Sequence, residues 1–441
     1  MEHESPVRYI GGLGARLVWL RMLASYAKYA ARRRRYPLFI LNPSKGGLLK
    51  TLQTAKDVRL QKFVKSNGGY RFCLSIPRWP SSAHDQMAAR GGLNVRAAGT
   101  KYKQQVDQAF LAVSRKCAYH CRHCYERHNT AAVETVPLAA WQRTAKDLQD
   151  LGANVIVLTG GEPMLRFDDV LELVKAGDKS RSEFHIHTSG HGVTEARASA
   201  LKRAGLEAAA IGLDDVNPAR HDTLRGYPGA FSEAVQAIHA FRRAGVFTYI
   251  NLCLTKDLVR SGDLPALMEL AKGLGLGAVR FLDPVPVGGY LGEDVSALFS
   301  DDDRKTATEF FEEVNGGRRY RRYPFISYEA YAEAPERLGC QMGGLSLFAV
   351  DSLGNVLPCV FLPVSFGNIL DEDLPSIYAR MRRAVPGPCR QGCSAALLAD
   401  AIKDQVNRGM PLPLPFESMR LEWQRLYPDS QALTEPLNLD T

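Results

Sequence analysis

The segment from residue 106 to residue 300 alternates short apolar runs with amphipathic stretches. This alternation predicts repeated strand-helix units and a parallel sheet. Glycines stand where the helical stretches should end: Gly152, Gly205, Gly245 and Gly275. Six runs have the length of strands: 109–114, 154–158, 183–187, 208–213, 247–252 and 278–282. Six units do not close an eight-stranded barrel, so we expect an α/β fold, a partial (β/α)6 TIM-like barrel, with its chemistry in the loops after the strands.

The remaining segments are predicted to surround this barrel. We expect a small cysteine-bearing auxiliary domain and several connecting segments. The predicted division is a basic amphipathic helical extension over 1–45, an irregular segment over 46–105, the barrel over 106–300, a helical connector over 301–338, the auxiliary domain over 339–400 and a C-terminal tail over 401–441.

The N-terminal extension is predicted to contain a helix over residues 12–35. Its apolar residues recur at helical spacing: Leu17, Leu20, Leu23, Ala24 and Ala27. Arg16, Arg21 and Lys28 flank them, so the helix is basic and amphipathic. It either docks on the body of the protein or lies on an anionic membrane surface. Sedimentation with membranes that is lost on deletion of residues 1 to 40 would favour a membrane lipid as the substrate.

Charge and cysteine usage indicate the setting of the chain. The formal net charge of +9 is concentrated in clusters at 32–35 and 318–322, and no nucleic-acid motif accompanies them, so we expect solvated faces and no nucleic-acid partner. No secretory signal or membrane-spanning stretch is evident. We therefore expect a cytoplasmic protein, with the inner face of the membrane as a peripheral site. In the reducing cytoplasm, the nine cysteines indicate metal ligands rather than disulfides.

Three cysteines follow the first barrel strand in the sequence CAYHCRHCY. Cys117, Cys121 and Cys124 have the spacing Cys-x3-Cys-x2-Cys. Three thiolates can hold three irons of a 4Fe-4S cluster and leave the fourth iron open to a ligand. The alternative is a zinc site that adds a histidine at 120, 123 or 128.

The cysteine spacing resembles that of radical S-adenosylmethionine (radical SAM) enzymes. In this family the open iron chelates the amino and carboxylate groups of SAM. The resemblance implies that an electron from the cluster cleaves SAM to methionine and a 5′-deoxyadenosyl radical, which removes hydrogen from the substrate. It also implies an electron donor such as flavodoxin or ferredoxin. The cofactor carries this chemistry, while the protein supplies binding and orientation.

The loops after the next strands also resemble this family. Gly160, Gly161, Glu162 and Pro163 end the second strand in LTGGEP, which resembles the segment whose backbone receives the SAM amino group. The two glycines would let the main chain approach a ligand. After the third strand, Thr188 or Ser189 is expected to hydrogen-bond ribose, with a helix cap or turn as the alternative.

The fourth-strand segment contains a His-Asp-x-x-Arg-Gly pattern at His221, Asp222 and Arg225, which resembles a recurrent pattern of the family. Arg225 is expected to bind the SAM carboxylate, because a guanidinium fork suits that group. The alternative is a structural ion pair with Asp222 or Asp214. The family often has Ser where Gly212 stands, so that contact to SAM is not predicted here.

A second cysteine group begins at Cys340 and continues to Cys359 with the spacing Cys-x13-Gly-x4-Cys. Cys389 and Cys393 follow. The arrangement resembles a shortened SPASM accessory domain, the "twitch" variant, and four thiolates can hold a second 4Fe-4S cluster. A structural zinc site is the alternative. A hairpin with its turn at Gly354 is expected to bring Cys359 beside Cys340.

Two cysteines stand outside these groups. Cys73 and Cys253 are most simply small buried hydrophobes. Because Cys253 ends a barrel strand, it is also a candidate to donate a hydrogen atom to a substrate radical.

The resemblance implies an enzyme but does not identify its substrate. SPASM and twitch relatives modify peptides and proteins, oxidise small alcohols or alter sugars. Sulfatase-maturing relatives have an acidic residue where Val360 stands, which disfavours that assignment. We expect a peptide or natural-product precursor, with a membrane lipid as the next candidate. The competing class is a non-enzymatic zinc-binding interaction protein.

Overall fold

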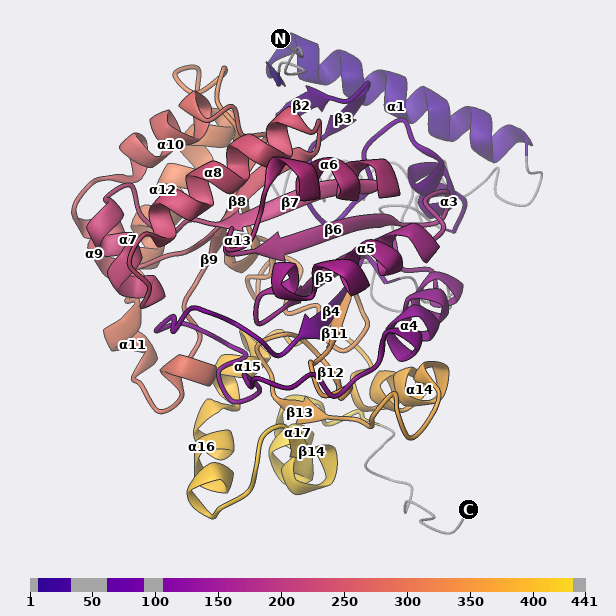
Figure 1. Cartoon of the computed structure of the whole chain (residues 1–441), viewed down its shortest axis with the longest axis vertical. Helices are drawn as coiled ribbons and strands as arrows, with labels where there is room; N and C mark the ends of the chain where they lie inside the picture. The colour runs from indigo at the N-terminus through magenta and orange to yellow at the C-terminus, as the bar shows by residue number, and fades with distance from the viewer. Residues whose placement is uncertain (1–6, 33–61, 91–105, 431–441) are drawn as a thin grey trace.

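A central nine-stranded sheet organises the protein (Figure 1). The computed structural model describes residues 7–32, 62–90 and 106–430. Six parallel strands make the middle of the sheet, and they confirm the six predicted strands: β4 Gln108–Ser114, β5 Val155–Gly160, β6 Glu183–Thr188, β7 Leu206–Gly212, β8 Phe247–Cys253 and β9 Ala278–Leu282. The predicted partial TIM-like barrel is therefore present.

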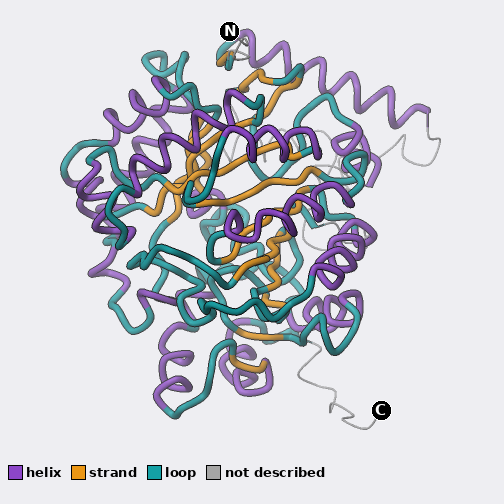
Figure 2. Tube along the Cα trace, viewed as in Figure 1, coloured by secondary structure: helices purple, strands orange, loops and turns teal. Residues whose placement is uncertain are grey.

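Helices connect these strands and cover one face of the sheet (Figures 1 and 2). They are α4 Leu138–Leu151, α5 Phe167–Ala176, α6 Glu195–Ala204, α7 Pro218–Arg225, α8 Ala230–Arg243, α9 Lys256–Arg260 and α10 Leu264–Gly273. The four glycines predicted to end helices all have positive φ, between 64° and 103°. Glycine adopts this left-handed conformation without the penalty that a Cβ atom would impose.

The sheet extends past the predicted strands at both edges. β10 (Phe325–Tyr328) pairs in parallel with β9, and β11 (Leu347–Val350) pairs in parallel with β4. The expected helical connector contains α12 (Asp301–Gly316) but also β10 and the short α13 (Glu329–Ala332), so the strand-helix rhythm continues beyond residue 300. β10 has only four residues and follows an arginine-rich segment, which hid it in the sequence.

The N-terminal segments close one end of the barrel. β1 (Arg8–Ile10), β2 (Phe63–Ser66) and β3 (Gly69–Arg71) form an antiparallel sheet, and α3 (Ser82–Arg90) follows. Val64 and Leu74 pack on buried residues where the barrel strands begin: Ala208, Phe247, Ala278 and Phe325. The segment predicted as irregular over 46–105 thus supplies a barrel plug in its described part, residues 62–90; the rest of that prediction lies outside the described residues.

Helix α1 (Leu13–Arg32) confirms the predicted N-terminal helix, but it docks through a different face. Ala15, Val18 and Met22 are buried against the N-terminal sheet. Leu17 and Leu20 of the predicted apolar stripe face outward instead, being 61% and 62% exposed. Among the helices of the described ranges, none combines the length and apolarity that a bilayer crossing requires.

The C-terminal domain packs below the barrel, at the end where the hairpin of β11 and β12 (Val356–Leu357) lies (Figure 1). Its other elements are β13 Val364–Ser365, α14 Leu374–Ala384, α15 Ser394–Leu397, α16 Ala399–Asn407, β14 Leu414–Pro415 and α17 Arg420–Leu426. The described part of the predicted C-terminal tail, up to residue 430, contains α16, β14 and α17. Phe416 and Trp423 are buried, and their rings contact the ring of Phe366. Packing these three apolar rings together removes their surface from water.

Candidate functional site

The two predicted cysteine groups line one cavity of about 300 Å3. The cavity lies between the carboxyl ends of the barrel strands and the C-terminal domain. Six of the seven predicted metal-binding cysteines line it: Cys117, Cys121, Cys124, Cys340, Cys359 and Cys393. Cys389 is buried and does not line it. The fold therefore brings together two groups that are more than two hundred residues apart in the sequence.

The first cysteine group lies in the loop after β4, and α7 holds this loop in place. His120 N–H donates to the Arg225 carbonyl (3.2 Å), and Arg122 N–H donates to the Leu224 carbonyl (2.9 Å). Burial raises the pKa of Cys117 to about 11 and of Cys124 to about 12. Both thiols are thus protonated before metal binds, and metal binding must release their protons.

The second cysteine group is assembled by the hairpin and by a bridge between two loops. Gly354 has φ of 91° at the turn between β11 and β12, as the predicted hairpin requires. Cys340 N–H donates to the Cys389 carbonyl (2.9 Å), and Cys393 caps the start of α15. Within the described ranges no three His, Cys, Asp or Glu side chains stand close enough together to hold a single metal ion.

Gly160 and Gly161 are required by contacts within the protein itself. A Cβ atom on Gly160 would lie 2.5 Å from the Ser114 carbonyl oxygen, and one on Gly161 would lie 2.3 Å from that of Lys116. These carbonyls belong to the start of the cysteine loop. The glycines therefore press the β5 loop against the cysteine loop, and both line the cavity. Their predicted contact with SAM stays a prediction.

Glu162 links the ends of β5 and β6. Its carboxylate is fully buried and accepts four hydrogen bonds, from Met164 N–H (2.9 Å), Thr188 Oγ1 (2.7 Å), Ser189 N–H (2.8 Å) and Ser189 Oγ (2.6 Å). Pro163 follows at the start of a 3-10 turn. Thr188 and Ser189 both line the cavity, but their hydroxyl protons are directed at Glu162, so toward a ribose each could act only as an acceptor.

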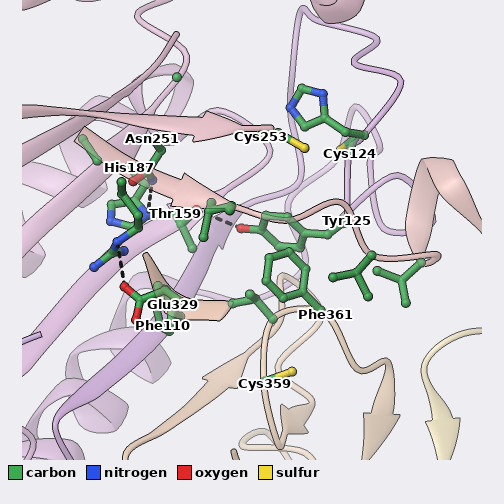
Figure 3. Close-up of a pocket in the computed structure, with 18 of the residues that line it drawn as sticks. Phe110, Cys124, Tyr125, Thr159, His187, Asn251, Cys253, Glu329, Cys359 and Phe361 are labelled. Atoms are coloured by element: carbon green, nitrogen blue, oxygen red, sulfur yellow. Dashed lines mark hydrogen bonds and ion pairs between the residues drawn. The ribbon is translucent and has the colours of Figure 1, made fainter. Parts of the chain in front are cut away.

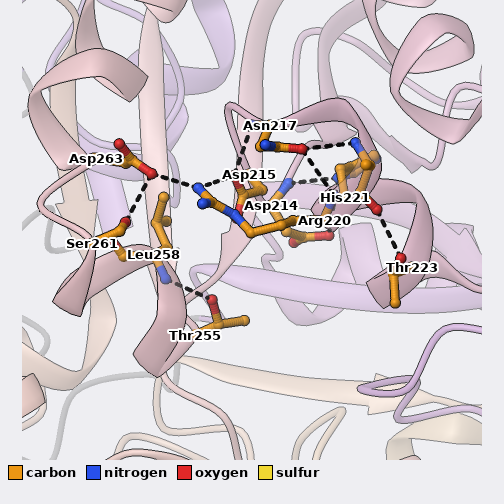
Figure 4. A network of polar contacts seen from close by, with 11 residues as sticks. Asp214, Asp215, Asn217, Arg220, His221, Thr223, Thr255, Leu258, Ser261 and Asp263 are labelled. Carbon is orange, nitrogen blue, oxygen red and sulfur yellow. Dashed lines mark hydrogen bonds and ion pairs between the residues drawn. The ribbon is translucent and has the colours of Figure 1, made fainter.

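His221, Asp222 and Arg225 of the His-Asp-x-x-Arg segment lie in α7, which follows the turn after β7, and His221 is part of the network in Figure 4. His221 Nδ1 accepts a hydrogen bond from Asp214 N–H (3.1 Å). Asp222 accepts from Gly229 N–H (2.7 Å) and Phe231 N–H (2.8 Å), at the start of α8. His221 therefore fixes the turn after β7, Asp222 fixes the connection between α7 and α8, and neither lines the cavity.

Arg225 lines the cavity, and its Nε donates to Asp214 Oδ2 (2.6 Å). Burial alone would raise the pKa of Asp214, but Arg225, His123 and His221 lower it to about 2. The predicted alternative of an ion pair with Asp214 is thus present. A Cβ atom on Gly212 would lie 2.3 Å from Arg225 Nη2. The guanidinium occupies the space that a serine at 212 would need, which explains the glycine.

Several cavity residues were not predicted from the sequence. Tyr125 and Phe361 lie between the two cysteine groups (Figure 3), with their ring centroids 5.9 Å apart. Tyr125 hydrogen-bonds Thr159 Oγ1 (3.0 Å). The signal available in the sequence was position: Tyr125 directly follows Cys124, and Phe361 stands two residues after Cys359.

The two remaining cysteines differ in their surroundings. Cys73 packs in the N-terminal apolar cluster, away from the cavity. Cys253 lines the cavity at the end of β8, and its N–H donates to Asp214 Oδ1 (3.0 Å). Burial and the nearby Asp214 carboxylate raise the pKa of the Cys253 thiol, so it keeps its proton at neutral pH.

The barrel around this site contains a radical SAM domain. Residues 111–260 match the model of the radical SAM superfamily, so the chain contains a radical SAM domain and uses SAM and a 4Fe-4S cluster. The chain is 28% identical over 290 residues to an AdoMet-dependent heme synthase of Nitratidesulfovibrio vulgaris, a match that covers 61% of this chain and 77% of that protein. It is 27% identical over 297 residues to a PqqA peptide cyclase of Gluconobacter oxydans, covering 63% and 80%.

Solved structures share the fold. SuiB of Streptococcus suis bound to S-adenosylmethionine has a TM-score of 0.53 at 17% identity, covering 74% of this chain and 81% of that chain. SuiB bound to its precursor peptide SuiA also has a TM-score of 0.53, covering 63% and 65%, just under two thirds of that chain. Because the coverage reaches 74%, the likeness extends beyond the barrel. The radical SAM homologues are enzymes, which favours an enzyme over the zinc-binding interaction protein.

Proposed function

We propose that this radical SAM enzyme acts on a peptide or natural-product precursor held in the cavity between its two cysteine groups. One observation carries the proposal: both groups line the same cavity, with Cys253 and several aromatic rings, Tyr125 and Phe361 among them, on its walls. Bound SAM, on reduction, supplies a 5′-deoxyadenosyl radical that abstracts hydrogen from the substrate. The residues of the chain hold the cofactors, exclude water and orient the substrate.

The ligand assignments belong to the same proposal. Cys117, Cys121 and Cys124 hold the SAM-binding cluster, and the second group of four cysteines holds an auxiliary 4Fe-4S cluster: Cys340, Cys359, Cys389 and Cys393. Cys121, Cys340, Cys359 and Cys389 are buried and suit this role, because metal-bound thiolates require no solvent. Gly160 and Gly161 of the β5 loop, together with Thr188, Ser189 and Arg225, form the walls beside the first group, where SAM would bind; Glu162 and Pro163 lie behind them in the same loop. Electrons would come from a flavodoxin or ferredoxin.

The relatives support a peptide substrate. The PqqA peptide cyclase is named for a peptide, and SuiB was crystallised with a precursor peptide. Heme synthases are also among the relatives. The second substrate class in the proposal is therefore a natural-product precursor that is not a peptide.

The proposal is tested by anaerobic purification with iron and sulfide counts, followed by reduction in the presence of SAM. We expect about eight irons and eight sulfides per chain and the formation of 5′-deoxyadenosine. A colourless preparation that contains zinc and does not cleave SAM would contradict it. Comparison of peptides and metabolites that increase 5′-deoxyadenosine formation would then identify the substrate.

Cys253 is proposed to donate a hydrogen atom from its S–H bond to the substrate radical, which would leave a sulfur-centred radical on the cysteine. Its protonated thiol and its place on the cavity wall support this role. In D2O, exchange labels the thiol, so turnover is expected to place deuterium in the product. A Cys253→Ala enzyme is expected to cleave SAM but not to form the deuterium-labelled product. Normal turnover and labelling by the variant would remove the hypothesis.

The exposed face of α1 supports a second proposal, that the protein binds to a membrane surface. Leu13, Leu17 and Leu20 form an exposed stripe on α1, and Arg16 and Arg21 are exposed beside it. Apolar side chains flanked by arginines suit an anionic lipid surface. We expect the protein to sediment with phosphatidylglycerol vesicles and the Leu17→Glu/Leu20→Glu variant to remain in the supernatant. Equal sedimentation of both proteins, or of neither, would refute membrane binding by α1.

A further inference from the structure

The inner wall of the barrel contains a layer of polar residues that lies deeper in the barrel than Cys253. Along β8 and β9 the side chains alternate, so residues two apart face the same side. Asn251 precedes Cys253 by two residues, Arg280 precedes Leu282 by two, and the strand register pairs Asn251 with Arg280. All four line the cavity. Asn251 and Arg280 are therefore adjacent on the inner wall, one level deeper than Cys253.

Arg280 is a buried cation with unused hydrogen-bonding capacity. Only 4% of the residue is exposed, and neither Nε nor Nη2 has a hydrogen-bond partner among the described residues. Its Nε lies 3.3 Å from Oε1 of Glu329, a carboxylate that is itself 40% exposed. Tyr249 places its ring 5.7 Å from the guanidinium carbon. Unsatisfied buried donors are costly, so such a group in a cavity indicates a ligand that supplies the acceptors.

Asn251 adds an unused acceptor beside this cation. Its Nδ2 donates to His187 Nδ1 (3.1 Å), and His187 Nε2 hydrogen-bonds the Tyr249 hydroxyl (3.0 Å). Burial lowers the pKa of His187 well below its usual value, so the imidazole is neutral and adds no competing charge. Asn251 Oδ1 is buried and has no partner within the described ranges.

The other polar groups at this level are already satisfied, and the barrel plug ends the cavity beneath them. Ser75 Oγ donates to Gln108 Oε1 (3.2 Å), and Gln108 Nε2 donates to the Leu74 carbonyl (3.2 Å). Below them, Leu74 packs with the apolar residues that begin the strands. A ligand can therefore reach Arg280 only with the end of a side chain or of a chain.

We propose that Arg280 binds a terminal carboxylate of the substrate, with Asn251 accepting a hydrogen bond from a donor next to that carboxylate. A guanidinium presents two parallel N–H donors that match the two oxygens of a carboxylate. Glu329, being partly exposed, gives way to the incoming group. The inference rests on the proposed function, since it names the substrate class: a peptide that ends in, or carries, an acidic group.

Binding is tested on the oxidised holoenzyme with SAM present, where no turnover occurs. The probes are N-acetylglutamate α-methylamide for a side-chain carboxylate, N-acetylglycine for a chain terminus, and N-acetylglutamine α-methylamide as the neutral control. Ligand-observed NMR titration is expected to show that one carboxylate probe binds at least tenfold more tightly than the amide. The carboxylate that binds identifies its source in the substrate.

Variants assign this preference to Arg280. Arg280→Met is expected to lose at least tenfold in affinity for the carboxylate and no affinity for the amide, and Arg280→Lys is expected to keep part of the preference. Arg260→Met is the matched control, because Arg260 pairs with Asp303 outside the cavity. Equal binding of acid and amide by the wild type, or an unchanged preference in Arg280→Met, would overturn the proposal. If Arg280→Met fails to fold, the comparison of acid and amide binding by the wild type and by Arg280→Lys still tests the proposal. Failure of SAM cleavage would instead refute the proposed function, since these titrations need no turnover.

Discussion

The Cys121→Ala enzyme is expected to form no 5′-deoxyadenosine when it is reduced in the presence of SAM. Cys121 lies in the middle of the first group, is 8% exposed, and its thiol is next to Arg225. Under the proposed ligand assignment, removal of one of three thiolates would leave the SAM-binding cluster with too few ligands, whereas the second group would keep its four. Iron and sulfide are expected to fall from about eight of each per chain to about four. Anaerobic metal analysis and chromatographic detection of 5′-deoxyadenosine measure both effects.

Cys73→Ala is the matched control for this experiment. Cys73 packs in the N-terminal apolar cluster and does not line the cavity, so the variant should keep its iron and cleave SAM at the wild-type rate. A Cys121→Ala enzyme that retained full iron content and 5′-deoxyadenosine formation would show that the first group does not hold the reactive cluster.

The barrel could be predicted because local pattern alone determines it. The six central strands are apolar runs with helices between them, and glycines with positive φ end the helices. The four-residue β10 carries too little pattern to be recognised. The barrel plug depends on contacts such as Leu74 with Ala208, between residues more than a hundred positions apart, and no local periodicity encodes those contacts.

The types of residue in the candidate site could be predicted from the sequence, but their arrangement in space could not. The cysteine spacing indicated two groups, yet their common cavity depends on how β11 pairs with β4. Gly212 could be explained only once the Arg225 guanidinium was seen to fill its Cβ position. Arg280 did leave a signal, because a cation in the middle of the apolar run AVRFL is unusual in a buried strand. Its significance depends on which face of β9 it occupies.

Replacing Glu162 with alanine is expected to destabilise the protein by about 3 kcal/mol or more, because this buried carboxylate holds the strand ends behind the cavity wall. The substitution leaves the N–H groups of Met164 and Ser189 without an acceptor and opens a void between the ends of β5 and β6. Two hydroxyls, those of Thr188 and Ser189, lose the same partner. Urea unfolding followed by circular dichroism, with both clusters in place, measures the effect.

Glu162→Gln separates hydrogen bonding from packing, because it keeps the shape of the side chain. One carboxylate oxygen accepts from Met164 N–H and the other from Ser189 N–H. An amide has one acceptor oxygen, so one of these N–H groups would face an NH2 donor, and about half of the alanine loss is expected to remain. Glu172→Ala, on the exposed face of α5 beside Lys175, should change stability by less than about 0.5 kcal/mol. If Glu162→Ala were as mild as Glu172→Ala, Glu162 would not be the link between the ends of β5 and β6, and the walls formed by Thr188 and Ser189 would have to be held by other contacts.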